Sequence, residues 1–323
     1  MSRFDPGWLE VQYNNRARVP EHPAIFERWA RASTLAREAS PCHLDLAYGD
    51  GPNETLDVFP PPRPSAPVLV FIHGGWWRSL DKRDHSFVAP AFARAGALVL
   101  LPNCALCPAV TIETIALQMV RALDWVHRHA GRYGGDPQRI VVASHSAGGH
   151  LAAMLLGCRW SEVARDLPPR LVRAALAVSG LFELEPLRHT PFLQADLRLT
   201  RASARRLSPA LFAPPEGTLL ATVGALESEE FLHQSRSIRD AWGARRVPVC
   251  ETIPGTHHFD VPDASSTRGR GCIGSRCTCS GCCRCLSPEE PNSARIATLN
   301  ALHCCFVLAD RARAAVACAV PPD

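Results

Sequence analysis

The chain has 323 residues, of which 46% are hydrophobic and 20% are charged, enough for one large α/β domain or two smaller ones. Its net charge of +4 is too small to predict nucleic acid or a membrane surface as a partner. No apolar run has the length of a signal peptide or a membrane span. We therefore expect a cytoplasmic protein of enzyme size, without disulfides.

The first hundred residues predict a helical arm, a hairpin and a buried strand. Residues 1–40 carry apolar positions at helical spacing, including Trp29, and predict a helical arm packed on the main body. Residues 43–48 and 54–59 alternate with period two around a glycine-containing turn, which predicts an antiparallel β-hairpin. Residues 66–72 are apolar throughout, as in a central strand covered on both faces.

The rest of the pattern alternates strands and helices. Further strands are predicted at 97–101, 140–142, 174–179, 218–223 and 247–253, and helices at 86–94, 111–133, 150–156 and 229–242. An irregular segment rich in Leu, Pro and Arg, 181–216, predicts a cap or lid. Such alternation predicts a mostly parallel central sheet with helices on both faces, preceded by the hairpin, and sites at the carboxyl ends of its strands.

One strand-to-helix junction has the pattern of a nucleophile elbow. The strand at 140–142 is followed by Ser144-His-Ser146-Ala-Gly148, and small and apolar residues of helical character come next. A serine on such a tight turn is lifted above the sheet, and small residues two positions before and after it let strand and helix approach closely. Ser144 stands where glycine is usual. The pattern alone also fits an ordinary turn.

An acid and a histidine follow this serine in the chain order of an α/β-hydrolase. Ser146 precedes Glu227, which comes just after the strand at 218–223, and His258, which comes just after the strand at 247–253. A serine hydroxyl needs a base to remove its proton, and the base needs a partner that fixes its tautomer. Glu229 and Glu230 compete for the role of acid, and His257 for the role of base.

A glycine-rich loop supplies candidate donors for an oxyanion. His73-Gly74-Gly75-Trp76 follows the first buried strand and matches the HGGG-type loop. Glycines here let backbone N–H groups turn inward, and we expect this loop and Ala147 to form an oxyanion hole. Trp76 and Trp77 are candidate walls of an aryl pocket, although tryptophans also serve simple packing.

These motifs together resemble the kynurenine formamidase (arylformamidase) branch of the α/β-hydrolases between about residue 10 and Val261. The segments that carry the resemblance are 13–20, 73–77, 103–108, 144–150 and 227–235. The resemblance implies hydrolysis of the small molecule N-formylkynurenine to kynurenine and formate, without a metal or other cofactor. It implies Ser146 as nucleophile, Glu227 as acid and His258 as base. Cys104 departs from the family pattern, in which a tyrosine is expected.

Two other functions fit the same residues. A broad-range carboxylesterase uses the same fold and triad, because these do not fix the acyl group. A hydrolase-fold protein impaired by an aberrant C-terminal segment is the second alternative. The sequence leaves the oligomeric state open, a homodimer included.

The composition changes abruptly near residue 263. Nine of the 14 cysteines follow Val261, and Cys279 and Cys282 have the spacing of a zinc-ligand pair, although their neighbours fit no common zinc module. A disordered tail is a second interpretation. We favour a third, in which a GC-rich gene is read out of frame after the histidine loop. The predicted organisation is an α/β-hydrolase domain, 1–262, and an atypical tail, 263–323.

Overall fold

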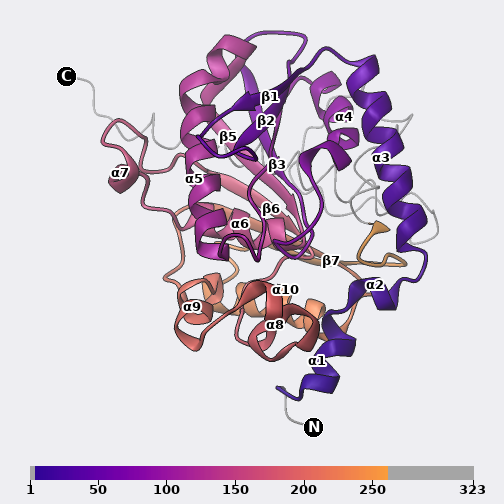
Figure 1. Ribbon diagram of the computed structural model, residues 1–323. Coiled ribbons are helices and arrows are strands. Elements are labelled where there is room, and N and C mark those ends of the chain that lie inside the picture. Colours follow the sequence, from indigo (N-terminus) through magenta and orange to yellow (C-terminus); the bar gives the residue numbers. More distant parts are fainter. Residues whose placement is uncertain (1–3, 261–323) are drawn as a thin grey trace, which may run out of the picture.

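The computed structural model describes residues 4–260 (Figure 1). Within that part an eight-stranded sheet has the order β1-β2-β4-β3-β5-β6-β7-β8. Its strands are β1 (His43–Ala47), β2 (Thr55–Phe59), β3 (Ala66–Ile72), β4 (Leu98–Pro102), β5 (Gly135–His145), β6 (Ala174–Val178), β7 (Thr218–Gly224) and β8 (Val249–Ile253). β2 pairs antiparallel with β1 and β4, and all other neighbours are parallel. The predicted α/β fold with an N-terminal hairpin is confirmed.

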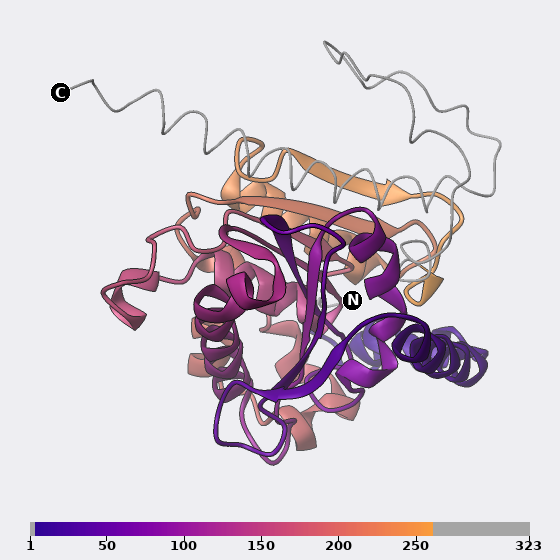
Figure 2. The same ribbon diagram turned by 90° about the horizontal axis from the view of Figure 1, so that it is seen from above.

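Ten helices, apart from short 3₁₀ turns, surround this sheet in the described chain. They are α1 (Pro6–Tyr13), α2 (Asn15–Arg18), α3 (His22–Ala39), α4 (Ala89–Arg94), α5 (Ile112–His129), α6 (Ala147–Leu156), α7 (Trp160–Val163), α8 (Pro191–Leu197), α9 (Arg201–Arg206) and α10 (Glu229–Trp242). Figures 1 and 2 show α3 and α5 on opposite sides of the sheet.

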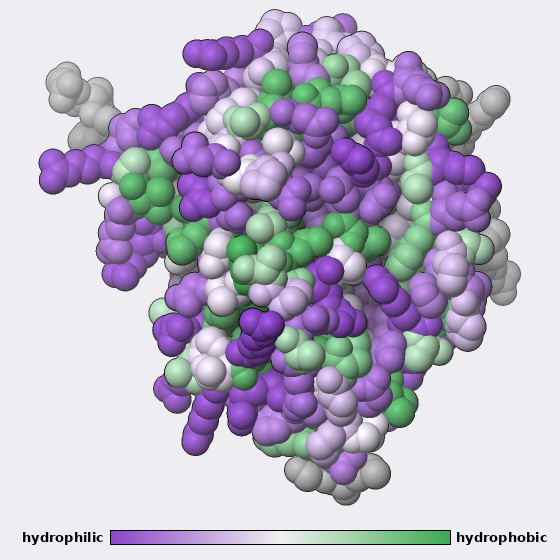
Figure 3. Space-filling model, in the orientation of Figure 1, coloured by the Kyte–Doolittle hydropathy of each residue, from purple (hydrophilic) through white to green (hydrophobic). Residues whose placement is uncertain are grey.

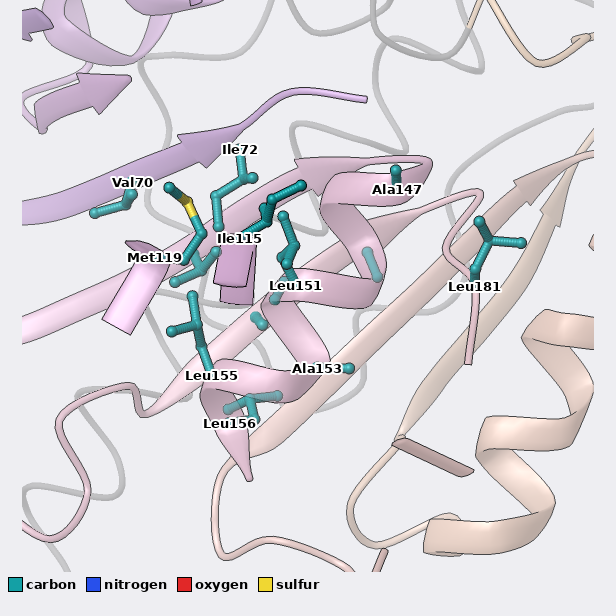
Figure 4. Close-up of a cluster of buried hydrophobic side chains, with 14 of the residues drawn as sticks. Val70, Ile72, Ile115, Met119, Ala147, Leu151, Ala153, Leu155, Leu156 and Leu181 are labelled. Atoms are coloured by element: carbon teal, nitrogen blue, oxygen red, sulfur yellow. The ribbon is translucent and has the colours of Figure 1, made fainter. Parts of the chain in front are cut away.

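The two faces of the sheet are covered by different helices because side chains alternate along each strand. On β3, Val68, Val70 and Ile72 join a core formed with α5, α6 and α10. Leu69 and Phe71 point the other way and join a core formed with α3 and α4. Figure 4 shows part of the first core, where side chains of β3, α5 and α6 meet. Both faces of β3 are buried, as its uninterrupted apolar sequence predicts.

Three elements differ from the prediction. The arm at 1–40 is three helices, because the side chain of Asn14 caps a new helix start at Asn15 and a turn precedes α3. The segment 181–216 contains α8 and α9, each with a threonine at its N-terminal boundary. The elbow strand begins at Gly135, before its apolar part, because Gly135 lies opposite Ala66 in the ladder with β3.

A buried ion pair fixes the hairpin to the loop after β3. Lys82, the only lysine of the chain, is 3% exposed and pairs with the buried carboxylate of Asp57 on β2. Its Nζ also lies 2.6 Å from Oδ1 of Asp45 on β1. Two carboxylates therefore compensate the charge of this ammonium group.

Hydropathy on the outer surface is mixed. On the face drawn in Figure 3, small apolar patches are separated by polar side chains. No helix within residues 4–260 is long and apolar enough to cross a membrane. The predictions made for 263–323, including the cysteine pair at 279 and 282, lie outside the described residues.

Candidate active site

The turn between β5 and α6 holds Ser146 in a backbone conformation that is rare for a residue with a side chain. Its φ is 56° and its ψ is −120°, and α6 begins with the next residue, three positions earlier than predicted. A Cβ on Gly148 would lie 2.2 Å from the carbonyl oxygen of Ile72, so glycine is required for α6 to lie this close to β3. The strand, the strained turn and the helix have the form of a nucleophile elbow.

Ser144 takes the place of the usual glycine without disturbing this turn. Its side chain is buried and its hydroxyl donates a hydrogen bond to the carbonyl oxygen of Leu176 on β6, at 2.8 Å. The polar group is therefore satisfied inside the sheet, which explains why a serine is tolerated at this position.

Ser146, His258 and Glu227 form a continuous chain of hydrogen bonds. Nε2 of His258 lies 3.0 Å from Oγ of Ser146, and Nδ1 of His258 lies 2.6 Å from Oε2 of Glu227. The three residues are only 2%, 4% and 7% exposed. Because the carboxylate can only accept, Nδ1 carries the proton and Nε2 is free to accept the proton of the serine.

The carboxylate of Glu227 is fixed by two further donors. Its Oε1 accepts hydrogen bonds from the hydroxyl of Ser179, at 2.5 Å, and from the backbone N–H of Gly224, at 2.8 Å. Ser179 stands directly after β6 with a φ of 52°. Ser179 is not among the site residues that the sequence predicts; its only sequence signal is its place at the end of the predicted strand at 174–179.

The competing residues lie elsewhere. Glu229 is exposed, and Glu230 is buried but accepts a hydrogen bond from the hydroxyl of Tyr13, at 2.7 Å. Nδ1 of His257 lies 3.2 Å from a carboxylate oxygen of Asp260. The structure therefore brings Glu227 and His258 to Ser146, and none of the three alternatives.

The loop that carries His258 is held from two sides. Nε2–H of His145 donates to the carbonyl oxygen of His258, at 2.9 Å, and the rings of these two histidines are 4.7 Å apart. Burial lowers the pKa of His145 well below its ordinary value, so its ring is neutral. Phe259 packs edge-on against Phe26 of α3, with ring centroids 5.1 Å apart. His145 is not among the site residues that the sequence predicts, because its only sequence signal is its place before Ser146.

Backbone N–H groups beside Ser146 are free to bind an oxyanion. Those of Gly75, Trp76 and Ala147 donate no hydrogen bond to any residue in 4–260. Gly75 has a φ of 108°, and a Cβ there would lie 2.0 Å from the carbonyl oxygen of Ser79. A Cβ on Gly74 would lie 3.0 Å from Cβ of Ser146, so this loop passes directly over the serine. The N-terminus of α6 adds a partial positive charge.

The two tryptophans do not share a pocket. Trp76 lines a cleft together with Ser146 and His258. Trp77 lines a separate, mostly apolar interior cavity with Cys104, and its indole packs edge-on against His150. Trp77 is buried, and its cavity is also lined by Gly74 and Ala147, next to the nucleophile. Its role as a wall of an aryl pocket stays a prediction.

The residues of the site can support acyl transfer. A hydroxyl, a neutral imidazole acceptor, a fixed carboxylate and free N–H donors lie together in a cleft. No group of three His, Cys, Asp or Glu side chains within the described chain is arranged to hold a metal ion.

Comparisons with known proteins find similarity to hydrolases. The BD-FAE family model matches residues 56–163. The chain is 28% identical over 268 residues to a kynurenine formamidase of Danio rerio, covering 78% of this chain and 89% of the fish protein. It is also 28% identical to the esterase LipQ of Mycobacterium tuberculosis, covering 78% of this chain and 62% of LipQ. A solved structure of a candidate thioesterase from Silicibacter sp. tm1040 has a TM-score of 0.71 and 29% identity, covering 80% of this chain and 94% of that one.

The mostly parallel sheet, the serine turn and these relatives define the chain as an enzyme of the α/β-hydrolase class. Within that class it is similar to the kynurenine formamidase-like branch: kynurenine formamidases from three animals are 26–29% identical to it over most of the chain.

Proposed function

We propose that this enzyme hydrolyses the formamide of N-formylkynurenine, giving kynurenine and formate, with Ser146 as nucleophile, His258 as base and Glu227 as acid. The observation that carries the proposal is the hydrogen-bonded series from Glu227 through His258 to Ser146, next to unpaired backbone donors. Similarity to formamidases over three quarters of the chain supports the choice of the formyl group.

Acylation begins when Nε2 of His258 accepts the proton of Ser146 as its Oγ attacks the formyl carbon. The carbonyl oxygen becomes an oxyanion, which accepts hydrogen bonds from the N–H groups of Gly75 or Trp76 and of Ala147. His258 then protonates the nitrogen of the departing arylamine, and the C–N bond breaks. A formyl ester on Ser146 is left.

Deacylation repeats these steps with water. His258 removes a proton from the water molecule as its oxygen attacks the formyl ester, and the same N–H groups stabilise the second oxyanion. Collapse of this intermediate returns the proton to Oγ of Ser146 and releases formate. Glu227 keeps the ring of His258 in one tautomer through both halves, because its own position is set by Ser179 and Gly224.

A carboxylesterase is the second candidate. Similarity to LipQ favours it, and the serine, histidine and glutamate would act on an ester without any change in their roles.

Turnover of the full-length chain on N-formylkynurenine and on p-nitrophenyl acetate distinguishes the two candidates. We expect kcat/KM to be higher for N-formylkynurenine, and Ser146→Ala to lower kcat on the order of 10⁶-fold for both substrates. Efficient cleavage of the ester with no formamide hydrolysis would favour the esterase. Near-normal turnover by the Ser146→Ala variant would exclude both mechanisms.

A further inference from the structure

Two residues of the short second helix, α2, reach the same cleft as the nucleophile. Asn15 and Arg16 line it together with Ser146, His258 and Trp76. The helix and the serine are separated by some 130 residues of sequence. Neither side chain takes part in the proposed chemical steps, so their presence in the cleft needs another explanation.

The side-chain amide of Asn15 is a buried donor without an acceptor. Asn15 is only 3% exposed, and its Nδ2 has no hydrogen-bond partner among residues 4–260. The neighbouring Asn14 shows a structural use of the same side chain, because its Oδ1 caps α2 by accepting from the N–H of Ala17. A buried amide nitrogen without a partner destabilises a fold, so an acceptor that enters the cleft would be bound there.

Arg16 places a positive charge beside that amide. Its guanidinium donates to the hydroxyl of Ser79, at 3.0 Å, and lies 5.6 Å from the ring centroid of Phe26. No carboxylate of the described chain pairs with Arg16, whereas the nearby Arg78 pairs with Asp196. Arg16 is exposed at the edge of the cleft, and partial desolvation together with the charge of Arg78 lowers its pKa.

We propose that Asn15 and Arg16 bind a carboxylate on the leaving group of the substrate, so that the enzyme prefers aryl formamides or aryl esters whose amine or alcohol portion is anionic. The amide N–H of Asn15 and the guanidinium of Arg16 donate hydrogen bonds, which a carboxylate can accept. A neutral aryl group offers no such acceptor. Trp76 and Phe26 also line this cleft, so an aryl ring bound in it would contact aromatic side chains. The inference rests on the proposed function, since the arylamine half of N-formylkynurenine carries such a carboxylate.

Matched ester substrates test the subsite independently of formamidase activity. The pair is nitrophenyl acetate and the acetate of a hydroxynitrobenzoic acid, which differ by one carboxylate on the leaving group. The ratio of kcat/KM for the anionic ester to that for the neutral ester is measured for the full chain and for Arg16→Ala and Asn15→Leu. Asn15→Leu keeps the buried volume and removes the donor, so its melting temperature should be unchanged or raised.

Arg18→Ala is the control, because it removes the same charge from an exposed position of the same helix, outside the cleft. We expect Arg16→Ala and Asn15→Leu to lower the ratio about 10- to 100-fold through KM of the anionic ester, and Arg18→Ala to change it less than about twofold. Equal losses on both esters, or an unchanged ratio, would overturn the subsite.

The result on N-formylkynurenine separates this inference from the proposed function. If the ratio falls in the variants but the full chain does not hydrolyse N-formylkynurenine, the carboxylate subsite stands and the assigned reaction is wrong. If N-formylkynurenine is hydrolysed equally well by the full chain and by both variants, the reaction stands and the subsite is wrong.

Discussion

Substituting Gly148 with alanine tests whether the close approach of α6 to β3 positions the nucleophile. The new Cβ would lie 2.2 Å from the carbonyl oxygen of Ile72 and 2.7 Å from that of His73. Both contacts are with backbone, so no side chain can rotate away. Reaching ordinary van der Waals separation requires α6 and the strand end to move apart by roughly 1 Å.

The expected cost of Gly148→Ala follows from two opposing effects. Overpacking of this kind costs about 1–3 kcal/mol, and replacing glycine by alanine in a helix returns up to about 1 kcal/mol. We therefore expect the free energy of unfolding to fall by about 1–2 kcal/mol. Since Ser146 and the loop after Ile72 would move relative to each other, we also expect kcat to fall by about 10²-fold.

Gly157 at the end of the same helix provides the matched control. Its φ is −83° and an added Cβ meets nothing closer than 3.6 Å, so Gly157→Ala should raise the free energy of unfolding by about 0.4–1 kcal/mol. Urea unfolding and turnover are measured for both variants. The reasoning is refuted if Gly148→Ala matches Gly157→Ala in stability and activity.

Three further predictions concern buried charged and titratable groups. Glu227→Gln should keep the fold and lower kcat by about 10²–10⁴-fold. The amide of Gln can donate a hydrogen bond to Nδ1 of His258, which holds the tautomer whose Nε2 cannot accept the proton of Ser146. Unchanged turnover would contradict the role of Glu227. Burial lowers the pKa of His150 to about 4, so below pH 6.5 the unfolded chain takes up a proton that the folded chain does not. Between pH 6.5 and pH 5, the free energy of unfolding of His150→Gln should therefore fall by about 1.5 kcal/mol less than that of the parent in urea unfolding. An equal fall in both proteins would count against this role. Lys82→Met leaves the carboxylate of Asp57 buried without its ammonium partner and should lower the free energy of unfolding by about 3–5 kcal/mol in the same assay, whereas a loss below about 1 kcal/mol would show that the pair is not needed.

The fold could be predicted because its signals are local. An apolar run such as 66–72 and a turn between alternating segments such as 43–48 and 54–59 each identify an element without knowledge of the rest of the chain. The sequence of Ser144 to Gly148 also identifies its own turn, because the small residues are required by contacts within that junction and with β3.

The partners of the serine depend on contacts that the sequence does not reveal. Glu227 stands two residues before α10 and Glu230 lies in its first turn, and the donors at Ser179 and Gly224 that hold the carboxylate of Glu227 come from other parts of the chain or from the backbone. The side chain of Trp77 is directed into the interior by two consecutive residues with positive φ, Trp76 and Trp77. Nothing in the sequence predicts positive φ angles at two tryptophans. Asn15 reaches the cleft only because α2 packs beside it.

Active-site labelling with a fluorophosphonate, followed by mass spectrometry of the digested protein, tests the central claim most directly. The probe reacts only with a serine whose proton is removed by a nearby base. We predict one adduct per folded chain, located on Ser146, and no adduct in the Ser146→Ala variant. A folded chain that is not labelled, or that is labelled at another serine, would contradict the account.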